Sequence, residues 1–195
     1  MSAAATYRPL ACVMGNLDLV RPLGLAGIRC VTVAPRGHPV HFSRFVVDSI
    51  DSDGPRLVDR LLRFGRAQPA RPVLSYESDD DLELIATHRV NPRFTLWAHL
   101  GACAGVNLPL LAYADNVGEP LSAAGRARGG VRWSWPRPDA KAARELGVPW
   151  WSWLGWTARS EAKTNLSLDD PMPFLRGRAW PKLALGMRSA IGRAR

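Results

Sequence analysis

The chain has 195 residues, of which 47% are hydrophobic, and its formal net charge is +9 at pH 7. A hydrophobic fraction of this size supplies a sizeable core, which excludes a chain that is disordered throughout and allows one domain or two small ones. The longest apolar stretch, residues 100–114, is too short to span a bilayer, so we do not expect a membrane-spanning protein.

The amino-terminal residues predict a strand, a helix and a second strand. Residues 10–14 form a short apolar run that ends in Gly15 and Asn16, and residues 17–26 carry apolar side chains at roughly helical spacing. Residues 28–34 are again mostly apolar and are followed by a proline. Two strands joined by a helix of this length predict a parallel pair with a right-handed crossover.

The same alternation continues to about residue 88. Residues 45–50 and 72–76 predict two further strands, and residues 55–64 predict an amphipathic helix between them. Ser78 is placed to cap a following helix, with Asp79 in its first turn, where the helix dipole favours a carboxylate. We therefore expect a small open α/β domain with a parallel sheet.

The second half has a different pattern. Residues 95–104 and 108–114 predict two helices, and residues 131–135 alternate as a short strand would. Two prolines end that strand, and Asp139 is placed to cap a helix over residues 140–146. We expect this half to be mainly helical and irregular, with many tryptophans and arginines.

Charge and tryptophan both concentrate in the second half. Residues 1–90 carry 11 basic and 10 acidic groups, whereas the remaining residues carry 15 and 7. A basic end of this kind attracts phosphates, nucleic acid or an anionic membrane, but we favour a solvated basic surface. The tryptophans would stack bases, anchor at a membrane interface or pack in a core, and we expect packing. Seven of the eight lie between positions 97 and 156: Trp97, Trp133, Trp135, Trp150, Trp151, Trp153 and Trp156.

Familiar catalytic and metal-binding motifs do not occur in the chain. It contains no GxSxG or HExxH sequence, its four histidines have no repeated metal spacing, and its three cysteines form no CxxC pair. Such isolated cysteines predict buried thiols in a reducing compartment, and Arg8 interrupts the apolar run that a signal peptide would need. We therefore expect a cytoplasmic protein.

The turn after the first predicted strand fits neither a dinucleotide fingerprint nor a P-loop. Gly15 permits a sharp turn at the carboxyl end of that strand. The helix that follows offers backbone N–H groups to an anion, so this turn serves either as an anion site or only as a turn.

Two blocks of sequence together resemble a known enzyme family and cover most of the chain. The first comprises Ala11-Cys12-Val13-Met14-Gly15, Val20-Arg21-Pro22-Leu23-Gly24-Leu25-Ala26-Gly27-Ile28, Phe42-Ser43-Arg44-Phe45, Val73-Leu74-Ser75 and Ser78-Asp79-Asp80. The second comprises Asn91-Pro92-Arg93-Phe94, Ala104-Gly105-Val106-Asn107-Leu108-Pro109, Gly130-Val131-Arg132-Trp133 and Asp170-Pro171-Met172-Pro173. These blocks resemble the two ends of the ATP-grasp carboxylate–amine ligases.

The resemblance implies a Rossmann-like pre-ATP-grasp domain over residues 1–89, followed over residues 90–195 by the end of the ATP-grasp domain and a family-specific tail. Such ligases use ATP and Mg²⁺ to phosphorylate a small carboxylate, and an amine then attacks the acyl phosphate. The resemblance assigns substrate binding to Gly15, Asn16, Ser78 and Asp79, metal binding to Asn91 and a catalytic role to Arg93.

The middle of such a ligase is missing from this chain. The family holds ATP with two lysines and an acidic, apolar hinge, yet the first lysine here is Lys141. Arg89 stands where the family has a metal-bridging glutamate two residues before Asn91, and arginine has no oxygen to offer a metal. The simplest account is an internal deletion of about 150 to 200 residues, the size of one ATP-binding domain.

These observations leave two classes of function. The first is a ligase by descent that is catalytically incomplete alone, with ATP and Mg²⁺ implied by the family but doubtful here, unless a partner chain supplies the missing part. The second is a non-catalytic binding protein that uses its basic, tryptophan-rich second half. We expect neither nucleic acid nor a membrane as a partner.

Overall fold

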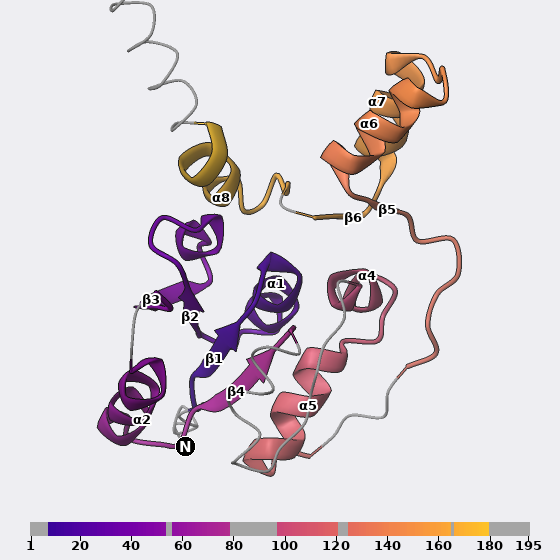
Figure 1. Cartoon of the computed structure of the whole chain (residues 1–195). Helices are drawn as coiled ribbons and strands as arrows, with labels where there is room; N and C mark the ends of the chain where they lie inside the picture. Colours follow the sequence, from indigo (N-terminus) through magenta and orange to yellow (C-terminus); the bar gives the residue numbers. More distant parts are fainter. Residues whose placement is uncertain (1–7, 54–55, 79–96, 121–124, 165, 180–195) are drawn as a thin grey trace, which may run out of the picture.

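A computed structural model describes residues 8–53, 56–78, 97–120, 125–164 and 166–179. Its centre is a four-stranded sheet with strand order β3-β2-β1-β4, in which every neighbouring pair is parallel (Figure 1). The strands are β1 (Ala11–Met14), β2 (Cys30–Ala34), β3 (Val46–Asp51) and β4 (Val73–Tyr76). The predicted α/β class with a small open parallel sheet is therefore confirmed.

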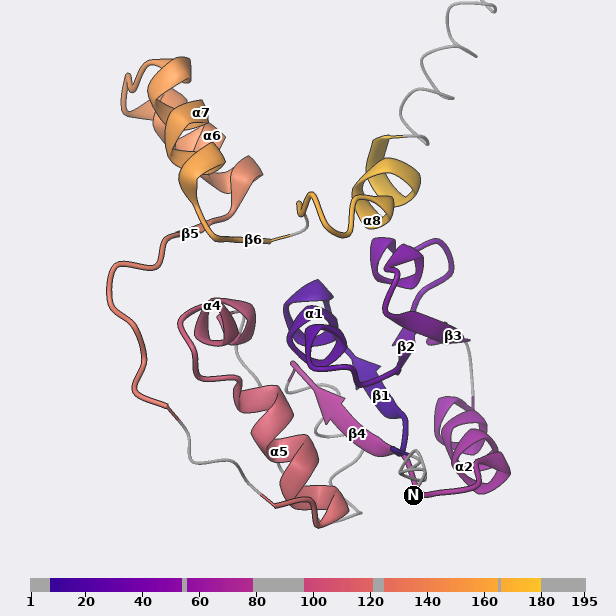
Figure 2. The same ribbon diagram turned by 180° about the vertical axis from the view of Figure 1, so that it is seen from behind.

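Different helices cover the two faces of the sheet, because neighbouring side chains of a strand point to opposite faces. Helix α1 (Leu17–Leu25) packs Val20 and Leu23 onto one face, together with Ala11 and Val13 of β1. Helix α2 (Leu57–Ala67) covers part of the other face, on which Cys12 and Met14 lie (Figure 2).

Helices from the second half extend the α1 face. Helices α4 (Ala98–Cys103) and α5 (Leu108–Val117) both pack against α1. Asn107, the N-cap of α5, donates a hydrogen bond from its side chain to the carbonyl oxygen of Pro22, at 2.7 Å. Tyr113 donates its hydroxyl proton to the carbonyl of Pro9, at 2.6 Å. Helix α5 is thus tied by half-buried hydrogen bonds to α1 and to the residues just before β1.

The chain then forms a helical hairpin and returns to the sheet. Strand β5 (Trp133–Ser134) pairs in parallel with β6 (Ala162–Lys163), and helices α6 (Pro136–Glu145) and α7 (Trp150–Arg159) pack together between them. Afterwards α8 (Met172–Phe174) and the π-helical turn η2 (Leu175–Ala179) contact the short 3-10 helix η1 (Pro39–Phe42). The sequence did not predict α7, since its tryptophans are not spaced as one apolar stripe.

The start of α6 differs from the prediction. The helix begins at Pro136, so Asp139 lies in its first turn and does not cap a helix that starts at residue 140. Its carboxylate accepts hydrogen bonds from the Trp135 backbone N–H, at 2.8 Å, and from the Ser134 hydroxyl, at 3.0 Å. A carboxylate that reaches back to the N-cap residue satisfies an N–H that the helix leaves open. The sequence analysis assigned Pro136 to the end of the strand, although proline also suits the first turn of a helix.

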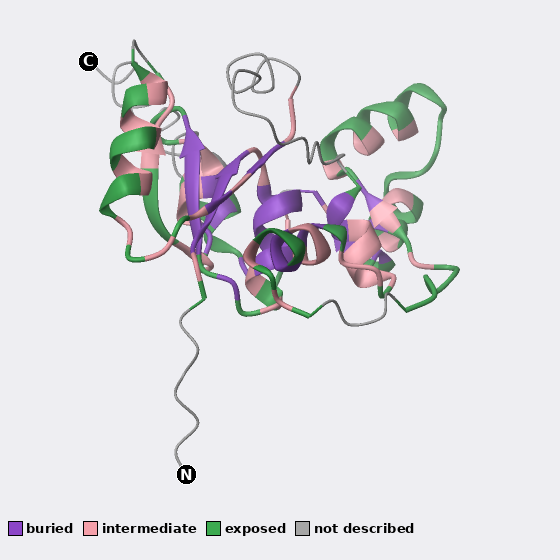
Figure 3. Cartoon of the chain, turned by 90° about the horizontal axis from the view of Figure 1, so that it is seen from below, coloured by how far each residue is buried: buried purple, intermediate pink, exposed green. Residues whose placement is uncertain are grey.

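Burial is concentrated on β1, β2 and α1, whereas α2, α6 and the hairpin tip carry mostly exposed or half-buried residues (Figure 3). Cys12 and Cys30 are buried free thiols, and burial raises the pKa of each to about 12. The predicted packing role of these two cysteines is confirmed. Among the described residues, no helix is both long enough and apolar enough to cross a bilayer.

Candidate functional site

The sheet brings three of the predicted substrate-binding residues to one edge. Gly15 and Asn16 follow β1 directly, and Ser78 comes two residues after β4. Met14 and Tyr76, the last residues of these neighbouring parallel strands, lie opposite each other. This carboxyl edge is where open α/β sheets bind ligands.

The other predicted site residues cannot be placed at this edge. Asp79, Asn91 and Arg93 lie outside the described residues, as does Arg89. The predicted metal and catalytic roles of Asn91 and Arg93 therefore stay predictions.

Glu77 is a site residue that the sequence analysis did not identify. One of its carboxylate oxygens, Oε2, accepts hydrogen bonds from both the backbone N–H and the side-chain amide of Asn16, each at 2.9 Å. The Glu77 side chain also lies over Gly15, where an added Cβ would come within 2.9 Å of it. The anion at the start of α1 is thus a carboxylate of the chain itself. The sequence feature that could have identified Glu77 is its position directly after β4, beside the predicted substrate-binding residues Ser78 and Asp79.

Asp18 is a second acid near this edge. It lies in the first turn of α1, is 1% exposed, and neither carboxylate oxygen makes a hydrogen bond of ordinary geometry. Burial raises the pKa of Asp18 to about 7, and the charge of Glu77 acts in the same direction, whereas Arg21 and Thr164 favour the ionised form. Near neutral pH this carboxyl group therefore exists in both protonation states.

A buried ionic cluster lies behind the edge, one turn further along α1. Arg21 and Asp170 are each 1% exposed, and Arg21 Nε lies 3.9 Å from Asp170 Oδ2. The Asp170 carboxylate also accepts hydrogen bonds from the Ser43 hydroxyl, at 2.6 Å, and from the Arg44 backbone N–H, at 2.9 Å. Arg21 donates a further hydrogen bond to the Lys163 carbonyl, at 3.0 Å.

Burial away from water shifts the pKa values of the groups in and beside this cluster. Burial lowers the pKa of Arg21, while the charges of Asp170 and Asp18 act in the opposite direction. His99 on α4 is 5% exposed, and burial, with the Arg21 charge, lowers its pKa to about 4. His99 is therefore neutral at physiological pH, and Arg21 depends on its two neighbouring acids for compensation.

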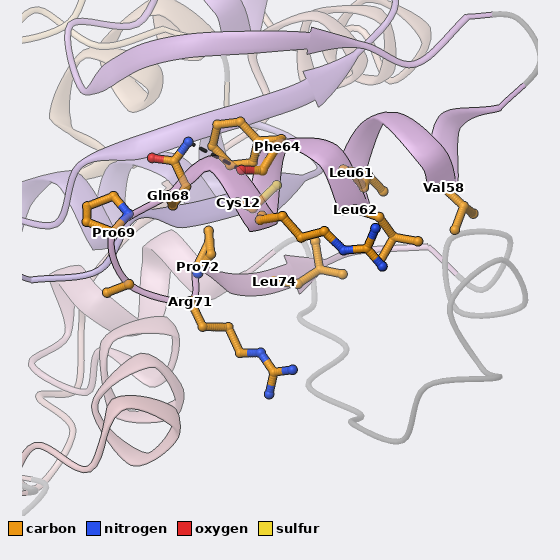
Figure 4. A pocket seen from close by; sticks show the side chains of 13 residues that line it. Cys12, Val58, Leu61, Leu62, Phe64, Gln68, Pro69, Arg71, Pro72 and Leu74 are labelled. Carbon is orange, nitrogen blue, oxygen red and sulfur yellow. Dashed lines mark hydrogen bonds between the residues drawn. The ribbon is translucent and has the colours of Figure 1, made fainter.

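A cavity lies elsewhere in the described residues. A cavity of about 550 Å³ opens between α2 and the first residues of β4, with apolar lining residues such as Cys12, Leu61 and Leu74 (Figure 4). Pro72 and Arg71, which precede β4, also line it, so it lies toward the amino edge of the sheet. It therefore does not include the residues that the sequence predicted for substrate binding.

The two described lysines are engaged away from the carboxyl edge. Lys141 is exposed on α6 and lies 3.8 Å from Glu145, and Lys163 donates to the carbonyl of Ser160. Neither amine is directed to a phosphate at the carboxyl edge. Within the described ranges, no three His, Cys, Asp or Glu side chains are grouped as a metal site would require.

The arrangement as a whole offers one acidic edge and one buried ionic cluster. Glu77 and Asp18 present carboxylates near the ends of β1 and β4, while Arg21 and Asp170 hold α1 against the returning chain. Comparisons of the chain with protein-family models, with curated proteins and with solved structures found no match.

Proposed function

We propose that the chain is a non-catalytic relative of the ATP-grasp carboxylate–amine ligases, in which the domain before the ATP-binding centre joins directly to the end of the ligase. One observation carries this proposal. Asp170, in the second block of resemblance, binds Ser43 and Arg44 of the first block through buried polar contacts. Such contacts between the two ends are what a chain would retain after it lost the ATP-binding centre.

The residual binding function, in this proposal, is directed to an amine rather than to a carboxylate. The N–H groups of Asn16 already bind Glu77, so a carboxylate ligand would have to displace that side chain. A protonated amine instead finds two acids, and its charge relieves the repulsion between Glu77 and Asp18. The half-buried Glu77 and the buried Asp18 would thus hold a small cationic substrate at this edge in the cytoplasm, without a phosphoryl-transfer step.

A phosphate-release assay tests the absence of turnover. The purified chain is mixed with ATP, Mg²⁺ and pooled amino acids, and the expected phosphate release equals the background without protein. Turnover above background that disappears in Asn91→Ala contradicts the proposal. Turnover that appears only with a co-purifying chain shows instead that a partner supplies the missing ATP-binding part.

Calorimetric titration with small amines tests the binding site. Glu77→Gln removes one charge from the edge, so we expect amine affinity to fall by about tenfold, as for a charged hydrogen bond of ~1.5 kcal/mol. Asp115→Asn, which removes an exposed acid from α5, serves as the matched control and leaves affinity unchanged. Equal amine affinities for the wild type and Glu77→Gln would contradict amine binding at this edge.

A second candidate function is that of a binding protein that acts through α6 and α7. The observation that favours it is the exposure of tryptophans for which the sequence predicted packing. Trp97, Trp135, Trp150, Trp151 and Trp156 are all exposed, so the predicted packing role is wrong for these five. A chain with both surfaces would bind a small ligand at the sheet edge and a larger partner at the hairpin.

A further inference from the structure

The tryptophan hairpin, defined here as residues 133–160, stands apart from the four-stranded sheet in both views of the ribbon (Figures 1 and 2). Its two helices pack on each other, and its inner side is closed by a hydrogen bond between the hydroxyls of Ser134 and Thr157, at 3.3 Å. Thr157, the buried residue of α7, is therefore on the side that faces β5. Next to Thr157 around the helix, α7 has an outer side whose side chains are exposed.

That outer side is apolar. Leu146 is 79% exposed, Trp150 67%, Trp151 63% and Leu154 47%. At about 100° per residue, the last three fall within an arc of about 100° on α7, so they form one face. Tryptophan is usually among the more buried residues, and a face with two exposed indoles is typical of a binding surface.

The hairpin and the residues just before it carry an excess of positive charge. Between residues 125 and 160 the chain has seven arginines and lysines, all exposed, and two acids. Asp139 is engaged by the Ser134 hydroxyl and the Trp135 N–H, and Glu145 lies 3.8 Å from Lys141. The side chains that are not paired within the hairpin therefore have a net positive charge. Among them, Arg144 lies near the end of α6 and Arg159 at the end of α7.

The geometry of the rings selects among anionic partners. Trp150 and Trp151 lie 5.8 Å apart with an angle of 80° between their planes, and Trp97 and Trp133 make a similar angle of 83°. Successive bases of a single strand need ring faces on which each can stack, and edge-to-face pairs do not offer two such faces side by side. A lipid interface requires only that amphipathic rings lie at the depth of the headgroups.

We propose that the tryptophan hairpin binds an anionic lipid surface. Trp150, Trp151 and Leu154 enter the boundary between headgroups and acyl chains, and exposed arginines of the hairpin contact lipid phosphates. This inference rests on the second candidate function, the use of the hairpin as a binding surface, and names its partner. It differs from the expectation from sequence that a membrane is not a partner.

Flotation of the full-length chain with vesicles tests the proposal. We expect it to float with vesicles of phosphatidylcholine and phosphatidylglycerol, and about tenfold or more weakly with phosphatidylcholine alone, since each nearby basic residue contributes to binding at an anionic surface. The double variant Trp150→Ser with Trp151→Ser should lower the partition coefficient by about a hundredfold, because two large apolar side chains no longer leave water. Arg144→Glu with Arg159→Glu should lower it by about tenfold or more.

Matched variants separate this effect from a general loss of surface character. Leu168→Ser removes a side chain that is 97% exposed outside the hairpin, and Arg63→Glu with Arg66→Glu reverses two exposed charges on α2. Both should float as the wild type does. All variants change exposed residues, and far-UV circular dichroism checks that they fold.

Two results would overturn the lipid assignment. Wild-type flotation of the double serine variant shows that the indoles are not the contact. Failure to float, combined with salt-sensitive binding of a labelled thymidine oligonucleotide that the double serine variant loses, assigns the hairpin to nucleic acid. The nucleic-acid result would contradict the lipid proposal but support the hairpin as a binding surface. Binding to neither the vesicles nor the oligonucleotide would contradict both the lipid proposal and the second candidate function.

Discussion

Two regions of the molecule reverse the usual distribution of side chains. Where the returning chain contacts α1, charged residues are buried: Arg21 and Asp170 are each 1% exposed. On the tryptophan hairpin, large aromatic residues are exposed instead. Folded proteins rarely bury charges unless they are paired, and they seldom expose neighbouring tryptophans. The contrast teaches that the first region holds the fold together, whereas the second is available for a partner.

The largest expected effect is at Asp170. Asp170→Asn leaves the Arg21 charge buried beside a neutral amide, and an NH2 group replaces one of the two oxygens that accept from Ser43 and Arg44. We therefore expect the unfolding free energy to fall by about 3 to 5 kcal/mol. Urea unfolding at neutral pH measures it. Asp169→Asn is the control, because Asp169 is half exposed, lies 3.6 Å from Arg44, and should contribute less than about 1 kcal/mol. Equal losses for both variants would mean that burial at Asp170 is not the cause.

The next effect depends on pH and concerns Asp18, whose pKa is raised from 3.8 to about 7 in the folded chain. Below about pH 3 the group is protonated in both states. Between about pH 4 and 7 it ionises in the unfolded chain first, so its contribution lowers stability as pH rises, by roughly 3 kcal/mol in all.

Asp18→Asn should therefore gain stability relative to the wild type, by about 3 kcal/mol between pH 4 and pH 7. The difference between the two proteins is the quantity to measure, since His99, with its pKa lowered to about 4, contributes an opposite slope to both. A difference that stays constant over this range shows that Asp18 has an ordinary pKa.

A smaller effect is expected where η2 contacts η1. A Cβ on Gly177 would lie 2.6 Å from the Cα of Pro39, so Gly177→Ala should force the two apart and cost about 1 to 3 kcal/mol. Gly65→Ala in α2 is the matched control. No atom lies within 4 Å of its added Cβ, and it should stabilise the helix by about 0.5 to 1 kcal/mol. Thermal unfolding of both variants tests the contact between η2 and η1. An unchanged midpoint for Gly177→Ala contradicts this packing.

The sequence predicted the sheet well and the polar contacts poorly, for physical reasons. Strands such as β2 and β4 are short apolar runs between turn residues, and that pattern depends only on neighbours along the chain. The partners of Asp170 lie more than 120 residues away, at Ser43 and Arg44, and no local pattern records them. Gly15 and Asn16 were correctly placed at the end of β1, but their contact with Glu77 required knowing that β4 lies beside β1.

The exposure of the tryptophans was also beyond local sequence. Trp150, Trp151 and Trp153 are equally large and apolar, yet only the third is half-buried. The sequence did contain the relevant charge pattern, an excess of basic residues in the second half. What it lacked was the orientation of α7.

The smallest predicted effect tests the central contrast most directly. If the outer face of the hairpin has no role in the fold, the double variant Trp150→Ser with Trp151→Ser should have an unfolding free energy within about 0.5 kcal/mol of the wild type, as exposed substitutions usually do. Urea unfolding of the two proteins side by side gives the answer. A loss of about 3 kcal/mol or more, the range for a buried aromatic side chain, would show that these indoles pack in the core and would contradict the account.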